Sequence, residues 1–558
     1  MPLSRRSPSR SIVRAVALVL AGAACALWPA TVVAAGGAEG AGAGDTGGGD
    51  AGRQPATLSV AASQEPGNLD PCFGGTPITT SVVMAAYETP VTYVTEARDG
   101  YRSQVPNDLE GWKPELAERV DVSEDRRTIT FHLRRGVRFY PSGNEMTAED
   151  WVWSWRRQLS EPAIGWCRFE NLQASITDPS QITAVDDYTV RVELGAANPR
   201  ALPFMRFQMF AIYDSREVRR HTDDDDPWAG EWLARNTAGT GPYYIDEWES
   251  GSRIVLRQNP MYWGEPPAYE RVEINIVPEE STRLALLQRG DVGLVKNVSP
   301  GLAERLGEDD GVSRLTIPSG NRVYLGFNVT TPPADRRALR EAVAWAVPYE
   351  SIIGDVYNGY GRRYRSFVLP ELEVYNPAGF PYETDAERAR RRVSELPASA
   401  RSLTLFVNAG AETERDAAVL VQDRLSAAGL EVEVQPLPSG QFTSRLFGKD
   451  LGFFITSGVS WIDDPATIAG LWMESGAQGN FTRFSNERVD TIQSEYRFAE
   501  PSPERREAYA EAQRIYNEEL NVVYLLLADH IVLQDAGVAG YTYYKDTATR
   551  FQDLRPER

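Results

Sequence analysis

Residues 403–434 carry the clearest folding pattern in this chain. A strand pattern at 403–407 is followed by a helical pattern from about residue 413 to 428, which Gly429 ends, and by a second strand pattern at 432–434. Glycine readily takes the left-handed backbone conformation that closes a helix. Because a strand, a helix and a second strand in this order form a βαβ unit, we expect the later half of the chain to fold as an α/β lobe.

The first half of the chain has a different pattern. Apolar and polar residues alternate at 57–61, 128–133, 188–194 and 254–256, which predicts strands rich in antiparallel pairing. With 558 residues the chain is too long for one compact core, so two or three lobes are expected. We expect the chain to cross between lobes near residues 315 and 520.

The N-terminus predicts export. Four arginines precede an uncharged stretch, and Val33-Ala34-Ala35 supplies the small residues that a signal peptidase recognises, so residues 1–35 are interpreted as a signal peptide. Two alternatives stay open. Gly22-Ala23-Ala24-Cys25 resembles half of a lipobox, in which Cys25 would be a lipid anchor. The uncharged span of ~21 residues is also long enough to stay in a bilayer uncleaved.

The segment at 36–56 is almost all Gly and Ala, and it is expected to form a disordered tether because it cannot bury enough apolar surface. Removing residues 1–35 leaves 54 basic against 78 acidic residues, so the net charge changes from -20 to -24. This charge argues against a nucleic-acid partner, since phosphate backbones are bound by clustered Lys and Arg. We expect the membrane to be contacted only through an N-terminal anchor.

Cysteine and histidine are scarce. If Cys25 is removed or acylated, Cys72 and Cys167 remain as a pair in an oxidising compartment and are expected to form a disulfide; the alternative is two buried free thiols. No metal site is expected, because the three histidines are scattered and the acidic run that follows His221 is typical of a solvated loop.

Ten short motifs occur in an order that resembles one known family. They are LAE at 116–118, SED at 123–125, TFHLRRGVRF at 130–139, MTAEDWVWSW at 146–155, GTGPY at 239–243, NPMYW at 259–263, LQRGDV at 287–292, YLGFN at 324–328, REAV at 340–343 and NGYG at 358–361. The chain is identified by them as resembling the family 5 extracellular solute-binding proteins. Those are oligopeptide and dipeptide receptors of ABC importers, with nickel-, haem- and oligosaccharide-binding relatives.

The resemblance implies an α/β fold of the bilobed periplasmic-binding-protein type (type II, cluster C) with a subdomain inserted in the first lobe. The boundaries we expect are 57–92, 210–317 and 522–558 for a discontinuous first lobe, 93–209 for the inserted subdomain and 318–521 for the second lobe. The implied function is a monomeric, exported, non-enzymatic receptor without a cofactor. It would capture a peptide by hinged closure and deliver it to permease subunits that work with cytoplasmic ATPases.

The cleft between the lobes is the expected site. Ligands of an α/β lobe bind beyond the carboxyl ends of its strands, so the loop at 457–465, which follows a strand at 453–456, is the leading candidate wall. In the peptide-binding relatives an Asp four residues before this proline holds the peptide amine, and here that position is Trp461. Trp461 offers a flat face for stacking, and Asp463 or Asp464 could supply the carboxylate. The alternative for Asp464 is a cap on the following helix.

Two further residues are weaker candidates for ligand contact. Phe73 lies in the segment after the first strand, which lines the cleft in relatives. Arg206 lies among phenylalanines, near where the nickel receptor keeps an arginine; the alternative is a salt bridge within the protein.

Three other interpretations of the chain remain, and one is that the binding domain acts as a sensor or regulator without transport. The same receptor could take an oligosaccharide, a metal chelate or another solute. A rival of another class is a secreted carbohydrate-active enzyme, suggested by 13 Trp and abundant carboxylates, although nothing in the sequence pairs the two carboxyls that it needs.

Overall fold

The structure is a computed structural model and describes residues 56–73, 76–106, 108–160, 166–306 and 311–557. The expected signal peptide, the expected tether up to residue 55 and Cys25 lie outside the described residues. No helix within these described ranges is long and apolar enough to cross a membrane.

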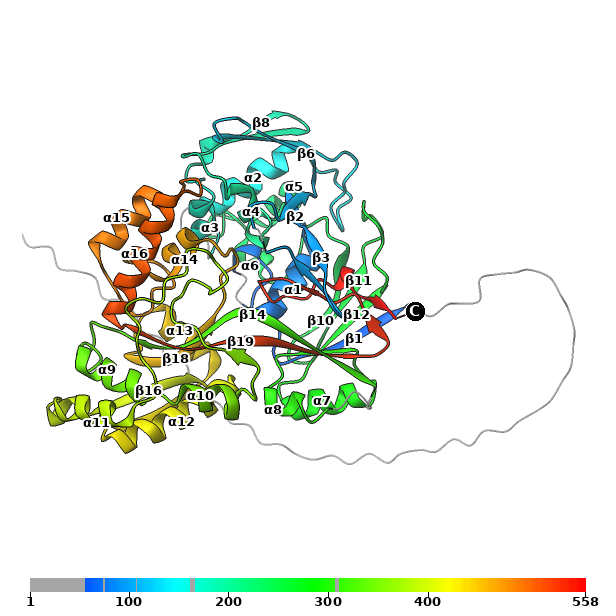
Figure 1. The fold of residues 1–558 in the computed structure, drawn as a ribbon. Helices are drawn as coiled ribbons and strands as arrows, with labels where there is room; N and C mark the ends of the chain where they lie inside the picture. The colour runs from blue at the N-terminus through cyan, green and yellow to red at the C-terminus, as the bar shows by residue number, and fades with distance from the viewer. Residues whose placement is uncertain (1–55, 74–75, 107, 161–165, 307–310, 558) are drawn as a thin grey trace, which may run out of the picture. The chain divides into compact units, whose positions relative to one another are not determined.

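Two long antiparallel strands, β14 and β19, connect the halves of a mixed sheet (Figure 1). The order within the described residues is β10-β11-β12-β1-β13-β19-β14-β18-β16-β17, with β15 also paired to β19. Their bounds are β1 Thr57–Ala62, β10 Tyr243–Glu249, β11 Arg253–Gln258, β12 Arg271–Ile276, β13 Leu294–Lys296, β14 Val312–Phe327, β15 Gly361–Arg362, β16 Ser402–Asn408, β17 Glu431–Leu437, β18 Phe453–Gly458 and β19 Val522–Asp535. β13 pairs with one end of β19, and β18 pairs with one end of β14. In the part of the chain that the structure describes, these two long strands therefore join the two halves of the sheet.

The βαβ unit expected at 403–434 is confirmed. β16 and β17 pair in parallel, and α12 (Glu412–Ala428) lies between them in sequence and packs on both. Gly429 ends this helix with a φ of 99°. The other helices of segment 318–521 are α9 Arg337–Ala346, α10 Tyr349–Ser351, α11 Ala386–Ser394, α13 Ser439–Phe447, α14 Pro465–Trp472, α15 Glu487–Tyr496 and α16 Pro503–Glu519.

The first-half strands pair mostly as expected. β10, β11 and β12 are antiparallel, whereas β1 pairs in parallel with both β12 and β13. The difference arises because the strands that flank β1 come from more than 200 residues downstream and not from a hairpin. The described α-helices outside segments 93–209 and 318–521 are α1 Pro77–Ala86, α5 Ser215–Val218, α6 Gly230–Leu233, α7 Glu280–Gln288 and α8 Pro300–Ala303.

Segment 93–209 forms its own antiparallel sheet in the order β6-β7-β9-β8. The bounds are β6 Ala117–Val122, β7 Thr128–Leu133, β8 Ile182–Asp186 and β9 Thr189–Glu193, with helices α2 Ala148–Gln158, α3 Cys167–Gln173 and α4 Ala201–Phe204. Trp151 and Trp155 of α2 pack on Phe131 of β7 with ring centroids 5.4 and 5.9 Å apart. These tryptophans therefore form core, and burying such large rings stabilises the segment.

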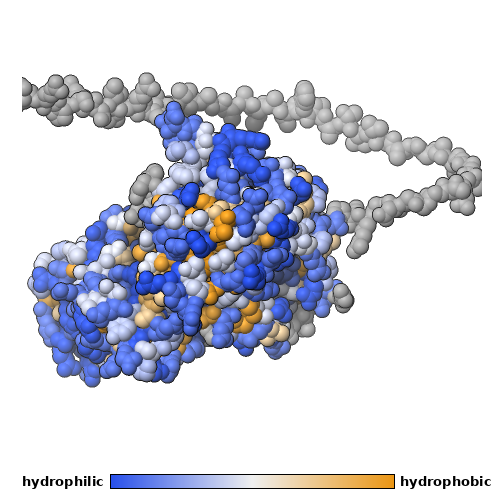
Figure 2. Space-filling view, turned by 90° about the horizontal axis from the view of Figure 1, so that it is seen from above, coloured by the Kyte–Doolittle hydropathy of each residue, from blue (hydrophilic) through white to orange (hydrophobic). Residues whose placement is uncertain are grey.

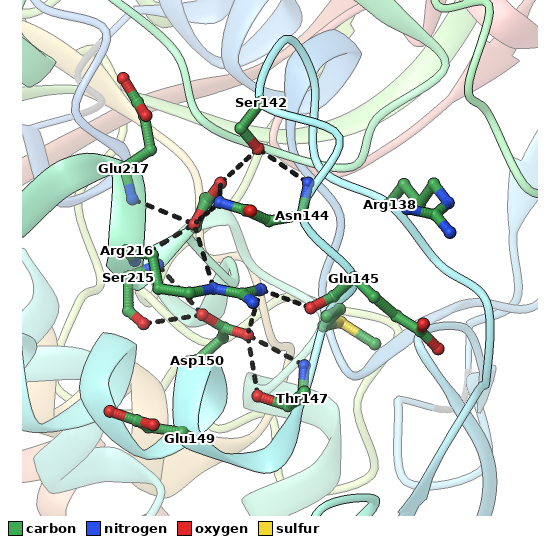
Figure 3. A network of polar contacts seen from close by, with 12 residues as sticks. Arg138, Ser142, Asn144, Glu145, Thr147, Glu149, Asp150, Ser215, Arg216 and Glu217 are labelled. Atoms are coloured by element: carbon green, nitrogen blue, oxygen red, sulfur yellow. Dashed lines mark hydrogen bonds and ion pairs between the residues drawn. The ribbon is translucent and has the colours of Figure 1, made fainter.

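Short strands and a polar network attach this segment to its surroundings. β2 (Val91–Tyr93) pairs with β5 (Trp112–Pro114). β4 (Arg102–Gln104) pairs with β3 (Thr95–Ala97) on one side and with β21 (Thr542–Tyr543) on the other. β20 (Val538–Ala539) and β22 (Arg555–Pro556), both outside the segment, pair with each other. At the start of α2 the Asp150 carboxylate accepts hydrogen bonds from Thr147, which closes the helix end as a capping box, and from the backbone and hydroxyl of Ser215 at the start of α5 (Figure 3). One buried carboxylate thus joins two helices.

The face seen from above is largely hydrophilic, with apolar residues gathered near its centre (Figure 2). A mainly charged and polar surface agrees with the excess of acidic residues in the composition.

Candidate functional site

A cavity of about 610 Å³ lies beside the β14 and β19 pair. Its wall comes from segment 93–209, from segment 318–521 and from the strands and loops outside both. The size falls within the range of typical small-molecule sites, about 300 to 1,000 Å³. Because residues on both sides of the two long strands line it, a solute in this cavity would contact both parts of the molecule.

Aromatic rings form one wall. Trp461, in the loop after β18, meets Phe207 with ring centroids 5.5 Å apart and Trp166 with centroids 5.8 Å apart. Trp166 also contacts Phe447 of α13 at 5.7 Å. All four residues line the cavity. Trp461, in the loop after β18 that we expect to form a wall, lines this cavity, and its contact with a ligand and the stacking role of its ring stay predictions.

The polar part of the wall is built where strands end. Thr456 and Ser457 lie in the carboxyl half of β18, and Ser460 lies in the loop that follows it. Asn408 ends β16, and Glu414 lies in the first turn of the helix that follows it. These positions agree with the general placement of ligands beyond the carboxyl ends of strands in α/β lobes.

Asp463 and Asp464 do not line the cavity. The Asp463 carboxylate pairs with Lys545 at 2.9 Å, and its backbone N–H donates to Asp108 at 3.0 Å. A ligand contact by Asp463 would require these interactions to separate.

Asp464 is the cap of α14, as the alternative interpretation had it. Its carboxylate accepts from the backbone N–H of Ala466 and pairs with Arg505 at 2.8 Å and Arg200 at 3.6 Å. Although burial favours the neutral acid, the two guanidinium groups hold the pKa of Asp464 below its ordinary value.

Arg206 lies outside the cavity wall. Its guanidinium group is fully buried and donates to the carbonyl oxygens of Pro203 and Gly111 and to the Asp108 carboxylate at 3.1 Å. The structure therefore gives Arg206 a salt bridge inside the protein and not the ligand contact that we expected. Its partner could not be read from the sequence because Asp108 lies 98 residues upstream.

Phe73 and the two paired cysteines are not among the described residues that line the cavity. Phe73 is 45% exposed and does not line the cavity in the described residues. Cys72 and Cys167 are joined by a disulfide. The carbonyl of Cys72 also accepts the backbone N–H of Trp166, so the disulfide region positions one ring of the aromatic wall.

Several residues that line the cavity were not chosen as candidate ligand contacts from the sequence. Three of them that can form polar contacts are Gln208, Glu414 and Asp529. Glu414 had a usable signal, since it follows a strand of the α/β lobe just as Trp461 does. Burial raises the pKa of Glu414, and a hydrogen bond from Ser457 opposes this change.

Titratable groups on β19 are also shifted. Burial raises the pKa of Asp529, while burial and the charge of Lys296 lower the pKa of His530 to about 3, so this histidine is neutral near pH 7. The part of the chain that the structure describes contains no group of three or more His, Cys, Asp or Glu residues arranged to hold a metal ion.

Solved structures establish the class of fold. The Helicobacter pylori periplasmic binding protein DppA, in complex with peptide STSA, aligns with a TM-score of 0.79 and 22% identity, and the alignment covers 90% of this chain and 98% of DppA. The Bacillus subtilis oligopeptide-binding protein AppA, in complex with a nonapeptide, aligns with a TM-score of 0.76 and 18% identity, and the alignment covers 90% of this chain and 100% of AppA. The chain has the bilobed, mixed α/β fold of periplasmic binding proteins.

The sequence comparisons establish the family. Residues 111–480 match the family described as "Bacterial extracellular solute-binding proteins, family 5 Middle", so the chain belongs to the family 5 bacterial extracellular solute-binding proteins. The probable D,D-dipeptide-binding periplasmic protein DdpA of Escherichia coli K12 is 25% identical over 87% of this chain and 91% of its own length. Heme-binding protein A of Haemophilus influenzae is 26% identical over 73% of this chain and 77% of its own length.

Proposed function

We propose that this protein is an exported receptor that captures peptides and delivers them to the permease of an ABC importer. The observation that carries the proposal is the cavity of about 610 Å³ whose wall is shared by residues on both sides of β14 and β19. A shared wall is what a hinged receptor needs, because only a ligand that contacts both lobes stabilises the closed state. The names of DdpA and of the two solved relatives, each with a peptide or dipeptide, favour a peptide over other solutes.

We assign the lobes to the boundaries expected from the sequence. Residues 57–92, 210–317 and 522–558 form the first lobe, 93–209 its inserted subdomain and 318–521 the second lobe. The two long strands then supply the hinge, since they are shared by both lobes. The measured affinity would equal the affinity of the closed state discounted by the fraction of free protein already closed.

The partners follow from the family. The receptor acts as a monomer outside the cytoplasm and meets membrane permease subunits, which cytoplasmic ATPases drive. Its contact with the membrane is through an N-terminal anchor alone: lipidation at Cys25 would supply that anchor, whereas cleavage after Ala35 would leave the receptor without one. It performs no catalysis, needs no cofactor and binds no nucleic acid.

The test is a thermal-shift and calorimetric screen of di- to octapeptides, with oligosaccharides and metal chelates as parallel arms. Peptides are expected to raise the melting temperature. W461A is expected to lower the affinity for the best-binding peptide by about tenfold, because it removes a large ring from the cavity wall. W232A, which changes a tryptophan outside the cavity, is the matched control. A response to an oligosaccharide or a chelate, and none to peptides, would reject the peptide assignment.

A transport receptor is distinguished from a sensor by measuring the uptake of a radiolabelled peptide that the protein binds. Loss of uptake on deletion of the cognate permease is expected for a transport receptor. Unchanged uptake in that strain would contradict the assignment to an ABC importer.

A further inference from the structure

The charges in the cavity wall are all of one sign. Glu414, Asp529 and Asp546 line it, and no Lys or Arg does so among the described residues. The one histidine in the wall, His530, is neutral for the reason given above. A ligand that enters this cavity therefore meets carboxylates without meeting a cation of the protein.

The three carboxylates are not equivalent. Asp546 forms an ion pair with Arg550 and accepts the backbone N–H of Ala548, so its charge is already compensated. Neither Glu414 nor Asp529 forms an ion pair among the described residues. The charge of Arg362 opposes the rise in the pKa of Asp529, whereas no charged group in the described ranges acts in this way on Glu414. Taking a carboxylate out of water without a counter-charge is costly, and the cost is recovered when a cation binds beside it.

Gln208 provides an independent sign that the wall awaits a hydrogen-bond donor. Its side chain is only 4% exposed, and its Nε2 donates to the Pro71 carbonyl at 3.0 Å. This bond fixes which end of the amide is the oxygen. The Oε1 atom is buried and has no hydrogen-bond partner among the described residues. Buried acceptors are nearly always satisfied, so an unsatisfied one in a cavity wall points to a donor carried by the ligand.

These acceptors come from three different parts of the chain. Gln208 lies in segment 93–209, Glu414 in segment 318–521 and Asp529 on β19. We propose that the solute carries a cationic nitrogen, an ammonium or guanidinium group, that pairs with Glu414, and that a second N–H of the solute donates to Oε1 of Gln208. This inference rests on the proposed receptor function and names the ligand chemistry that its site selects. The carboxylate that recognises the cation then comes from α12 and not from the loop that precedes Pro465.

A cationic nitrogen has two sources in a peptide, the free amino terminus and a basic side chain. Three probes separate them. The first is a pool of tripeptides built from Ala, Ser, Leu and Phe with free amino termini, the second is the same pool N-acetylated, and the third is an N-acetylated pool in which each peptide carries one Lys. Binding is measured by native mass spectrometry and then by calorimetry on the strongest peptide.

Wild-type protein is expected to bind the first or the third pool at least about tenfold more tightly than the second, since a charge-assisted hydrogen bond is lost on acetylation. E414Q keeps the size of the side chain and should abolish the difference between pools. E412Q, two residues earlier on the same helix and outside the cavity wall, should behave as wild type. Q208L should lower the affinity for the preferred peptide pool about fivefold. Melting curves will show that each variant is folded.

Two results would overturn the inference, and each can be told apart from a result that rejects only the peptide assignment. Equal binding of the free and acetylated pools by wild type and E414Q would leave a peptide receptor that does not select a cation. If no peptide pool binds, spermidine and a neutral oligosaccharide pool replace them. Binding of spermidine that E414Q abolishes would support the inference without peptides, whereas oligosaccharide binding that E414Q leaves unchanged would overturn both proposals.

Discussion

Segment 93–209 meets the rest of the molecule at two junctions of different chemistry. At the first, the Cys72–Cys167 disulfide is reinforced by a buried ion pair between Asp70 and Arg157 at 2.6 Å, and we call this the covalent junction. At the second, Arg200 meets Asp464, and Asp108 meets the loop at Asp463, and we call this the ionic junction.

The two junctions teach where a hinge can work. A disulfide cannot separate during a binding cycle, whereas ion pairs exchange for water at a small net cost because the desolvation that they required is recovered. The ionic junction joins segment 93–209 to segment 318–521, and the aromatic contacts of Trp461 lie along the same boundary. Opening is therefore expected at the ionic junction, with segment 93–209 moving together with the first lobe.

The largest effect should follow from removing the disulfide. In C72S/C167S the free energy of unfolding is expected to fall by about 4 kcal/mol, because the cross-link closes a loop of 95 residues in the unfolded chain. Urea denaturation measures it, and reduced wild type is the control. A variant as stable as the oxidised wild type would show that the covalent junction adds nothing.

The next effect concerns the buried ion pair of the covalent junction. R157M is expected to lower the free energy of unfolding by about 3 kcal/mol, because Asp70 is left buried with hydrogen bonds but without a cation. R156M is a control of the same size on the same helix, and it loses one long hydrogen bond to a carbonyl oxygen. Equal losses in R157M and R156M would contradict a special role for the pair.

Breaking the ionic junction should change the open fraction more than the stability. D464N keeps a side chain that can cap α14 but removes the charge between Arg200 and Arg505, so the closed state should lose about 1 to 2 kcal/mol relative to the open state. Small-angle X-ray scattering should show a larger radius of gyration without ligand, and peptide affinity should fall about tenfold.

The exposed pair Arg126 and Glu500 supplies the control for that experiment. It spans the same two segments at 2.9 Å, but both side chains are about half exposed, and E500Q should alter the scattering curve and the affinity little. If E500Q opened the protein as much as D464N, burial of the ionic junction would not be what holds it closed.

The contrast between the junctions also explains what the sequence could reveal. The βαβ unit, the cap at Thr147 and the core role of Trp151 and Trp155 follow local rules of spacing, and each is confirmed. Two cysteines follow the expected signal peptide and left few pairing choices, so their disulfide was accessible as well.

The polar site was harder, because its partners are distant in sequence. Arg206 finds Asp108 across 98 residues, and Asp463 finds Lys545 across an even longer stretch, so neither pairing has a local signature. Both residues were taken for ligand groups because a charge beside aromatic residues or in a cleft loop has the same local pattern in either role. Glu414 was accessible in principle, since the rule that led to the loop after β18 applies equally to the helix start after β16.

The smallest effect is on pH dependence, and it should leave the ionic junction unchanged. Glu88 lies outside both junctions, and burial and the nearby Glu115 raise the pKa of Glu88 to about 8, although Thr240, Tyr262 and Trp263 donate hydrogen bonds to it. The folded protein then keeps a proton that the unfolded chain, with a carboxyl pKa of 4.5, has lost. Stability from this group is complete below pH 4.5 and is lost as the pH rises towards 8.

Asp464 at the ionic junction has the opposite sign. Its pKa is lowered, so its contribution is complete above pH 3.8 and is lost only in stronger acid. Between pH 6.5 and 7.5, the free energy of unfolding should therefore fall by about 1 kcal/mol through Glu88 while the ionic junction stays unchanged. E88Q, which cannot lose a proton, should flatten this slope in urea titrations at each pH, whereas D464N should leave it intact. A slope that survives in E88Q would mean that a group other than Glu88 supplies it.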